Sequence, residues 1–290
     1  MHVVTSRGLA IVLSSLLAMA LSLAPIATPR AAADPAYTIG VVPQFEARRL
    51  AEIWMPILDE ISKRTGYAFQ MVGASDIPQF EGEFMQGTYD FAYMNPYHAL
   101  VAEDTQGYLP IIRDGGRQLF GILVVRKDAP FQSVSELAGK SIAYPAPNAL
   151  GASLLIRADL DRIFALDYTA SYVATHSSAY LNVFLGGADA AGGVMATFRK
   201  QDPAIGDQLR VLYETTRVPP HPIVVHPRVP HEAAEAFRKA VLDLAETDEG
   251  AALLAQVPFR KAIAAGATDY AVLRDLALES YFVPPDTGTD

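Results

Sequence analysis

The sequence predicts an α/β fold built as two lobes that are joined by two crossings of the chain. From residue 37 onward, strand-like apolar segments alternate with helix-like segments, as in a largely parallel sheet covered by helices. The alternation restarts at residue 141, after one domain's worth of elements. The stretch "TRVPPHP" at 216–222 is dense in proline and suits a stiff connection between lobes.

The first lobe begins with the strand "YTIGVV" at 37–42 and a helix at 47–66 whose apolar residues recur every three to four positions and which ends at a glycine. The expected elements that follow are the strand "YAFQMV", a polar helix, the strand "FAY" at 91–93, the strands "LPIIR" and "FGILVVRKD" that continue the first sheet, and the short helix "FQSVSELAGK".

The second lobe starts with the strand "SIAY" at 141–144. It continues with a helix from 152 to about 164, the strand "YTASYV", the helix "SSAYLNVFLGG", the strand "AAGGVM" and the segment "QLRVLYET". Beyond the prolines we expect a strand "IVVHP" and helices over 231–257 and 267–282. We assign 34–127 and 216–290 to the first lobe and 128–215 to the second, with crossings near 127–131 and 215–222.

The N-terminal residues 1–33 have the pattern of a signal peptide. Arg7 precedes an uncharged apolar run, and Ala31–Ala33 supply the small residues of a cleavage site. An uncleaved membrane anchor is the alternative, although the apolar run is short for a bilayer span. We expect a soluble, exported protein that acts in the periplasm after cleavage near Ala33.

Charge and cysteine content exclude several classes of partner. Without Arg7 and Arg30 the chain has 21 basic and 32 acidic residues, a net charge of −11, which argues against nucleic acid or an anionic membrane as a partner. The sequence has no cysteine, so neither a disulfide framework nor a cysteine-ligated metal is possible. We expect no cofactor and a monomeric protein.

Polar and aromatic residues follow three of the expected strands, where ligands settle in open α/β sheets. Tyr93 ends "FAY", with Asn95 and Tyr97 after it; residues 144–151 run from the end of "SIAY"; and residues 175–178 follow "YTASYV". Each group has a structural alternative. The two tyrosines suit a core, Ser177 or Ser178 suits a helix N-cap, and His176 suits a solvated loop.

The chain resembles the phosphate, phosphite and phosphonate binding proteins of bacterial ABC importers, which are extracytoplasmic receptors with the type II periplasmic-binding fold. The resemblance rests on "YTIGVVPQFEARRLAEIWMPILDEISKRTGYAFQMV", "FMQGTYDFAYMNPYHAL", "LAGKSIAYPAPNALGASLL", "HSSAYLNVFLGGADAAGG" and "VPPHPIVVHPRVP" with "FRKAVLDLAETDEG". It implies capture of a small anion between the lobes for a membrane permease, with ligand contact at Tyr93, Asn95 and His176 and closure by the loop 147–152.

The chain departs from this family at two places. It has no hydroxyl between Tyr144 and Ser153, where the family usually has a serine- and threonine-rich turn, and it lacks the acidic residue expected soon after "GGADA". Asp189 fits better as a structural residue. Backbone amides near Gly151 could still hold an anion, and the site would suit a less charged or more apolar ligand, walled in part by Met195.

The expected ligand contacts are therefore Tyr93, Asn95, Tyr97, Tyr144, Asn148, Leu150, Gly151, Ala152, His176, Ser177 and Ser178. An enzyme is disfavoured because the chain lacks a G-x-S-x-G elbow, an H-E-x-x-H pair and a P-loop. A metal receptor using His221, His226 and His231 is disfavoured because positions 221 and 226 point to opposite faces of a strand. A periplasmic module that feeds a sensor kinase stays open as an alternative to import.

Overall fold

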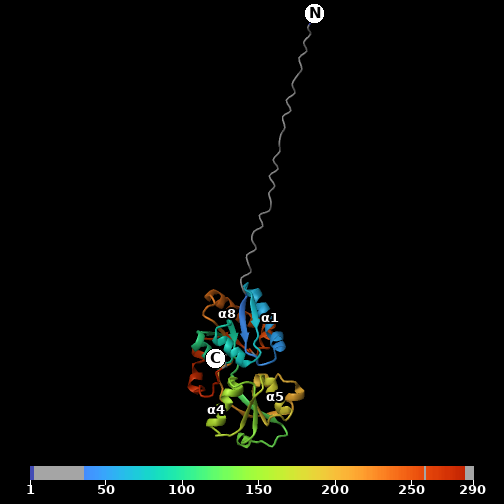
Figure 1. Cartoon of the computed structure of the whole chain (residues 1–290), viewed down its shortest axis with the longest axis vertical. Helices are drawn as coiled ribbons and strands as arrows, with labels where there is room; N and C mark the ends of the chain where they lie inside the picture. Colours follow the sequence, from blue (N-terminus) through green and yellow to red (C-terminus); the bar gives the residue numbers. More distant parts are fainter. Residues whose placement is uncertain (3–35, 258, 285–290) are drawn as a thin grey trace. The chain divides into compact units, whose positions relative to one another are not determined.

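The computed structural model describes residues 1–2, 36–257 and 259–284 (Figure 1). Apart from its first two residues, the predicted signal peptide lies outside the described part of the chain. Among the described residues, no helix has both the length and the apolar character that a bilayer span requires.

The first lobe is built on a six-stranded sheet with the order β11-β4-β10-β3-β1-β2. Its strands are β1 (Tyr37–Val41), β2 (Phe69–Val72), β3 (Phe91–Tyr93), β4 (Leu109–Asp114), β10 (Ile223–Val225) and β11 (Ala262–Ala264). β1 pairs in parallel with β2 and β3, whereas β10 runs antiparallel to β3 and β4. The register places Val41 and Ile223 on either side of Tyr93, so the carboxyl end of β3 lies at the centre of the sheet.

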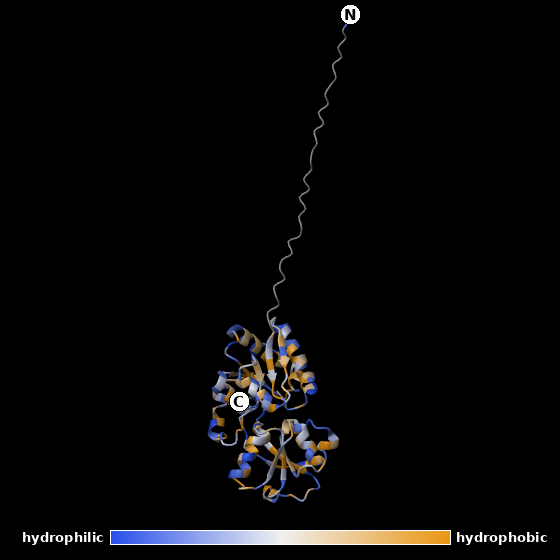
Figure 2. Ribbon diagram, viewed as in Figure 1, coloured by the Kyte–Doolittle hydropathy of each residue, from blue (hydrophilic) through white to orange (hydrophobic). Residues whose placement is uncertain are grey.

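Helices α1 (Ala47–Thr65), α2 (Ile77–Met85), α3 (Pro96–Gln106), α8 (His231–Ala245) and α9 (Asp248–Leu254) belong to this lobe (Figure 1). α1 buries Leu50, Trp54, Ile57, Leu58 and Ile61, the apolar stripe expected from the sequence, and ends at Gly66 in the left-handed conformation. α8 contributes Phe237, whose ring stacks on Phe91 of β3 with 4.4 Å between ring centroids. In Figure 2 the hydrophobic colour follows these strands, and both colours alternate along the helices.

The second lobe is built on a five-stranded sheet with the order β7-β6-β8-β5-β9. Its strands are β5 (Gly121–Arg126), β6 (Ser141–Tyr144), β7 (Thr169–Tyr172), β8 (Ala190–Val194) and β9 (Leu209–Glu214), and its helices are α4 (Leu155–Arg162), α5 (His176–Phe184), α6 (Met195–Phe198) and α7 (Pro203–Gly206). A π-helical turn over Leu150–Leu154 precedes α4, and a 3-10 turn covers Val134–Leu137. Asp189 accepts hydrogen bonds from the amide and hydroxyl of Ser141, which confirms its structural role.

The two faces of this sheet carry separate cores because successive strand residues point to opposite sides. Leu123 and Val125 of β5 pack with Ile156 and Leu160 of α4, whereas their neighbours Ile122 and Val124 pack with α5 on the other face. Figure 1 shows α4 and α5 on opposite sides of the strands. This is the helix-covered sheet that the alternation of segments predicts.

The prediction that 120–128 continues the first sheet was wrong. β5 pairs antiparallel with β8 and β9 in the second sheet, so the chain crosses between lobes at 115–120 instead of 127–131. The return crossing covers 215–222, and Leu119 and Val218 join the two crossings by reciprocal backbone hydrogen bonds of 2.8 Å. β5 is buried on both faces and therefore has no polar alternation that would assign it to either sheet.

The C-terminal part also differs from the expected helix over 267–282. It forms two 3-10 turns, Ala267–Asp269 and Ala271–Leu276, and Ala277 adopts a left-handed conformation. Arg162 of α4 donates to the carbonyls of Leu276 and Ala277, so tertiary contacts bind backbone groups that a continuing helix would use. β11 was not expected, because its three residues, Ala-Ile-Ala, are too few to show the alternation of apolar and polar residues that indicates a strand.

Candidate ligand-binding site

The strand ends where we expected the ligand enclose a cavity of only about 10 Å³. This is close to the minimum space that one water molecule needs. Its lining includes five predicted contact residues, Asn95, Leu150, Gly151, Ala152 and His176. The structure therefore brings these residues together, but they pack against protein and leave no room for a phosphonate.

The loop before α4 is packed tightly against β5 and β8. A Cβ atom at Gly151 would lie 2.6 Å from Cγ1 of Val194, and one at Gly121 would lie 2.0 Å from the carbonyl oxygen of Gly151. Leu150 is 1% exposed and belongs to the core. Gly151 thus permits the close approach of two protein segments, whereas we had expected it to permit the approach of an anion.

The two asparagines among the predicted contacts form hydrogen bonds between the lobes and do not line an open site. Asn148 of the second lobe donates from Nδ2 to Oε2 of Glu81 (2.9 Å) and to the carbonyl of Val283 (2.6 Å), and its Oδ1 accepts from the amide of Val283 (2.8 Å). Asn95 caps α3 and donates to the carbonyl of Asn148 (3.1 Å). Glu81 also lies 2.8 Å from Nε2 of His98, and both side chains are buried. The amide groups of this cluster are therefore occupied by protein.

The serine pair and the histidine at α5 have structural contacts. The N-cap of α5 is Thr175, which accepts from the amide of Ser178, so the prediction of a cap at Ser177 or Ser178 was displaced by two to three residues. His176 is buried, and Nδ1 lies 3.2 Å from the hydroxyl of Thr197. Burial lowers the pKa of His176 to about 4, so this imidazole is neutral at pH 7 and does not attract an anion through a charge.

The two remaining aromatic candidates lie outside both interlobe cavities. Tyr144 is fully buried in the core of the second lobe and packs near Tyr168 and Tyr172. Tyr97 lies on α3 with its ring 5.7 Å from that of Phe282. These positions agree with the core alternative that the sequence left open for Tyr97.

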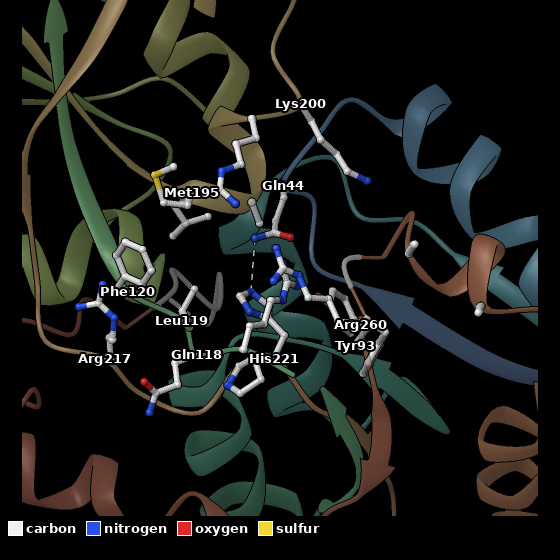
Figure 3. Close-up of a pocket in the computed structure, with 18 residues that line it drawn as sticks. Gln44, Tyr93, Gln118, Leu119, Phe120, Met195, Lys200, Arg217, His221 and Arg260 are labelled. Atoms are coloured by element: carbon white, nitrogen blue, oxygen red, sulfur yellow. Dashed lines mark hydrogen bonds between the residues drawn. The ribbon is translucent and has the colours of Figure 1, made fainter. Parts of the chain in front are cut away.

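A larger pocket lies next to the filled cavity and has a volume of about 580 Å³ (Figure 3). It shares Gln44, Val194 and His221 with the small cavity and also contacts both crossings of the chain. Its charged lining residues are all basic: Arg117, Arg199, Lys200, Arg217 and Arg260. Neither aspartate nor glutamate occurs among its 18 lining residues. A strongly acidic chain thus forms a cationic pocket.

Tyr93 is the predicted contact residue that lines this larger pocket. Its ring stacks on His221 at 5.3 Å, its hydroxyl donates to the carbonyl of Val257 at 3.4 Å, and it is 5% exposed. Gln44 lies 3.3 Å from Nε2 of His221, the contact drawn in Figure 3. The side chains of Tyr93, His221 and Gln44 therefore form a polar part of the pocket wall at the end of β3.

Arg117 is the electrostatic centre of the pocket. Its Nε lies 2.9 Å from Oδ2 of Asp114, and burial lowers its pKa. Burial, together with the charges of Arg49 and Arg117, lowers the pKa of Lys200. Burial holds the pKa of His221 well below its usual range, and the positive charge of Arg117 lowers it further. These groups repel one another, so a bound anion would relieve the repulsion.

Two of the cations lack a compensating partner. In the described ranges, Arg199 and Arg260 form neither an ion pair nor a side-chain hydrogen bond, and both are exposed. Arg217 differs because its guanidinium pairs with Glu214 at 3.0 Å and stacks on the ring of Phe120 at 4.4 Å. Arg199 and Arg260 are thus free to bind an external anion.

The sequence did not identify these basic residues because they are distributed over four loops that are far apart along the chain. Arg117 and Arg217 lie within the two crossings, Arg199 and Lys200 follow α6, and Arg260 precedes β11. Only the fold brings them to one pocket. Among the described residues, no group of three or more histidine, aspartate or glutamate side chains could hold a metal ion.

The two sheets, their helices and the paired crossings form the type II periplasmic-binding fold. The chain belongs to the family described as "ABC transporter, phosphonate, periplasmic substrate-binding protein", which matches residues 39–270. Members of this family are periplasmic substrate-binding components of transporters. No curated protein matches the chain significantly in sequence.

Several solved structures share the fold at low sequence identity. A binding protein component of an ABC phosphonate transporter from Pseudomonas aeruginosa has a TM-score of 0.75 and 19% identity, with 84% of this chain and 85% of that chain covered. A PhnD protein from Prochlorococcus marinus, solved in complex with methylphosphonate, has a TM-score of 0.77 and 13% identity, with 86% of this chain and 99% of that chain covered. A Xanthomonas citri protein bound to ATP has a TM-score of 0.68 and 17% identity, with 85% of this chain and 98% of that chain covered.

Proposed function

We propose that this protein is the periplasmic receptor of an ABC importer and that it captures a small organic anion in the cationic pocket beside Tyr93. The observation that carries the proposal is the pocket lining, in which five basic side chains and no carboxylate surround about 580 Å³. A chain with an excess of acidic residues does not attract anions in general. A cluster of basic side chains in one pocket therefore supports a specific binding site for an anion.

The family and a relative's ligand support the anionic class. The family is that of phosphonate transporters, and the Prochlorococcus marinus protein was solved with methylphosphonate. In this chain the anion binds mainly to side chains, because the loop 145–152 lacks hydroxyl groups and is packed against β5. Of the residues expected from the strand ends, Tyr93 contacts the ligand, whereas Asn95, Asn148 and His176 support the lobes.

Delivery to a permease requires export and recognition of the loaded receptor. We propose that residues 1–33 are removed during export, that the mature protein is a monomer in the periplasm, and that the permease binds it when both lobes contact the ligand. Sequencing the N-terminus of the periplasmic form should give Asp34 or a residue within one or two positions of it. Intact Met1 on a membrane-bound form would contradict cleavage.

Native mass spectrometry of protein purified from its host periplasm tests the ligand class. We expect a retained small anion, and we expect its affinity in calorimetry to fall as the salt concentration rises, because the binding groups are exposed cations. A retained ligand that is neutral or cationic would contradict the proposal, as would an affinity that does not change when Arg199 and Arg260 are both replaced by alanine.

A further inference from the structure

The cationic pocket also has a substantial apolar wall. Half of its 18 lining residues are apolar, and the largest of these are Phe120, Met195 and Phe259. Phe120 and Met195 are only partly buried, so their side chains can contact a ligand. An inorganic oxyanion would pair with the basic groups and leave this wall in contact with water, which costs the free energy of apolar exposure.

Charge and apolar surface are unevenly distributed in the pocket. Arg117 interacts electrostatically with Tyr93 and Arg260. Figure 3 shows Tyr93 and Arg260 on one side and Phe120, Met195 and Arg217 on the other. The charge of Arg217 is already matched by Glu214, and its guanidinium covers one face of the Phe120 ring. Arg117 and Arg217 are each paired with a carboxylate, Asp114 and Glu214. The cations of the described lining with neither an ion pair nor a side-chain hydrogen bond are therefore Arg260, beside Tyr93, and Arg199, one helical turn after Met195, and the large side chains of Phe120 and Met195 lie on the side away from Arg260.

The size of the pocket agrees with a ligand that contacts both sides. A volume of about 580 Å³ falls within the range of roughly 300–1,000 Å³ that is typical of sites for organic molecules. By contrast, the cavity at the strand ends has only about 10 Å³. The single methyl group of methylphosphonate offers little apolar surface to Phe120 and Met195.

From the proposed function we infer further that the ligand is an amphiphilic organic anion. Its anionic head binds beside Tyr93, Arg117 and Arg260, and its apolar or aromatic body lies against Phe120 and Met195. Met195 belongs to the second lobe, Phe120 ends the crossing that leads into it, and Tyr93 belongs to the first lobe, so such a ligand contacts both lobes at once. A small head group alone contacts only one side of the pocket.

Phenylphosphonate and methylphosphonate form a matched pair of probes, because both carry the same head group and differ in the apolar body. With the mature exported protein, calorimetry should give a Kd for phenylphosphonate that is at least about 10-fold lower than the Kd for methylphosphonate, the gain expected from burying an aromatic ring. Met195→Ser should remove most of this gain and leave the methylphosphonate affinity unchanged. Phe120→Leu serves as a second variant, which removes the aromatic ring and keeps an apolar side chain.

The outcomes separate this inference from the proposed function. Equal affinity for the two probes would overturn the inference and leave an anion receptor. A preference for phenylphosphonate that persists in both the Met195 and Phe120 variants would also overturn it, because the apolar body would then bind elsewhere. Failure of phosphate, methylphosphonate, phenylphosphonate and benzoate to bind at all would overturn the proposed function itself.

Discussion

Asn148, in the loop that precedes α4 of the second lobe, donates a 2.9 Å hydrogen bond to Oε2 of Glu81 on α2 of the first lobe. The same amide exchanges two further hydrogen bonds with the backbone of Val283, which is also outside the second sheet. Both Asn148 and Glu81 are at most 2% exposed. The lobes are thus held together by a buried polar cluster at the place where the sequence predicted a ligand.

Replacing Asn148 by alanine should therefore favour separation of the lobes. The variant loses three hydrogen bonds, one of which meets a buried carboxylate, and such a bond contributes about 1.5–3 kcal/mol. Small-angle scattering of the ligand-free variant should give a larger radius of gyration than that of the wild-type protein. The melting temperature should fall as well.

Asn182→Ala is a matched control, because the Asn182 amide donates to the carbonyl of Ser178 within α5 and to no group of the first lobe. If the Asn148 and Asn182 variants had the same radius of gyration as the wild type, the buried cluster would not determine the distance between the lobes.

The unpaired arginines predict a loss of affinity without a loss of stability. Arg260→Ala should weaken phenylphosphonate binding by about 10-fold, since a hydrogen bond to a charged group contributes about 1.5–3 kcal/mol. Arg199→Ala, which removes a charge beside Met195 and farther from the head group, should weaken it less. The melting temperature should stay the same or rise slightly, because each variant removes a cation that repels its neighbours and breaks no described ion pair.

Arg48→Ala provides the comparison for these variants. Arg48 lies on α1 with its side chain 90% exposed and is not part of the pocket lining. Its replacement should leave affinity unchanged. An equal loss in the Arg48 and Arg260 variants would mean that the total charge of the protein, and not the pocket, determines anion binding.

The order of most strands and helices could be predicted from periodicity, but the assignment of β5 to a sheet could not. Alternating apolar segments and turn residues are local, so they identify β1, α1 and β6 directly. Which sheet receives a strand buried on both faces depends on its partners far along the chain, here β8 and β9. The same long-range dependence explains the first crossing, which lies at 115–120.

The location of the candidate pocket could be predicted from the sequence only in part. The strand ends do face the space between the lobes, and Tyr93 lines the larger pocket, as its position at the carboxyl end of β3 suggested. Whether a loop leaves space or fills it depends on packing between distant atoms, such as the Gly151 carbonyl against Gly121. The basic residues come from four separate loops, so no local pattern connects Arg117 with Arg260.

The buried imidazole of His176 predicts a specific loss of stability in acid. Because its pKa is about 4 in the folded protein and 6.5 in the unfolded chain, the unfolded state binds the proton first as pH falls. The free energy of unfolding should be unaffected above pH 6.5 and should decrease between 6.5 and 4, by roughly 1.4 kcal/mol per pH unit at most.

His176→Gln removes this titration and keeps a polar side chain near Thr197. Urea unfolding at several pH values should therefore give a shallower loss of stability for the variant than for the wild type across the same interval. Parallel curves for the two proteins would show that His176 is accessible to protons in the folded state.

Lys200 predicts that anion binding takes up a proton. Burial and the charges of Arg49 and Arg117 lower its pKa from 10.5 in the ligand-free protein, and an anion in the pocket should raise it again. In the alkaline window between the free and bound pKa values, part of the free protein has a neutral amine and the complex has a charged one. Binding should then consume protons, and affinity should fall as pH rises through that window.

Calorimetric titrations with phenylphosphonate in two buffers of different ionisation enthalpy measure this uptake directly. Lys200→Arg is the decisive comparison, because an arginine keeps the positive charge but does not titrate in this range. The variant should bind with similar affinity and show no dependence of the binding enthalpy on the buffer. Proton uptake that persists in Lys200→Arg would assign it to another group, and its absence in the wild type would mean that the anion does not lie near enough to change the charge state of Lys200.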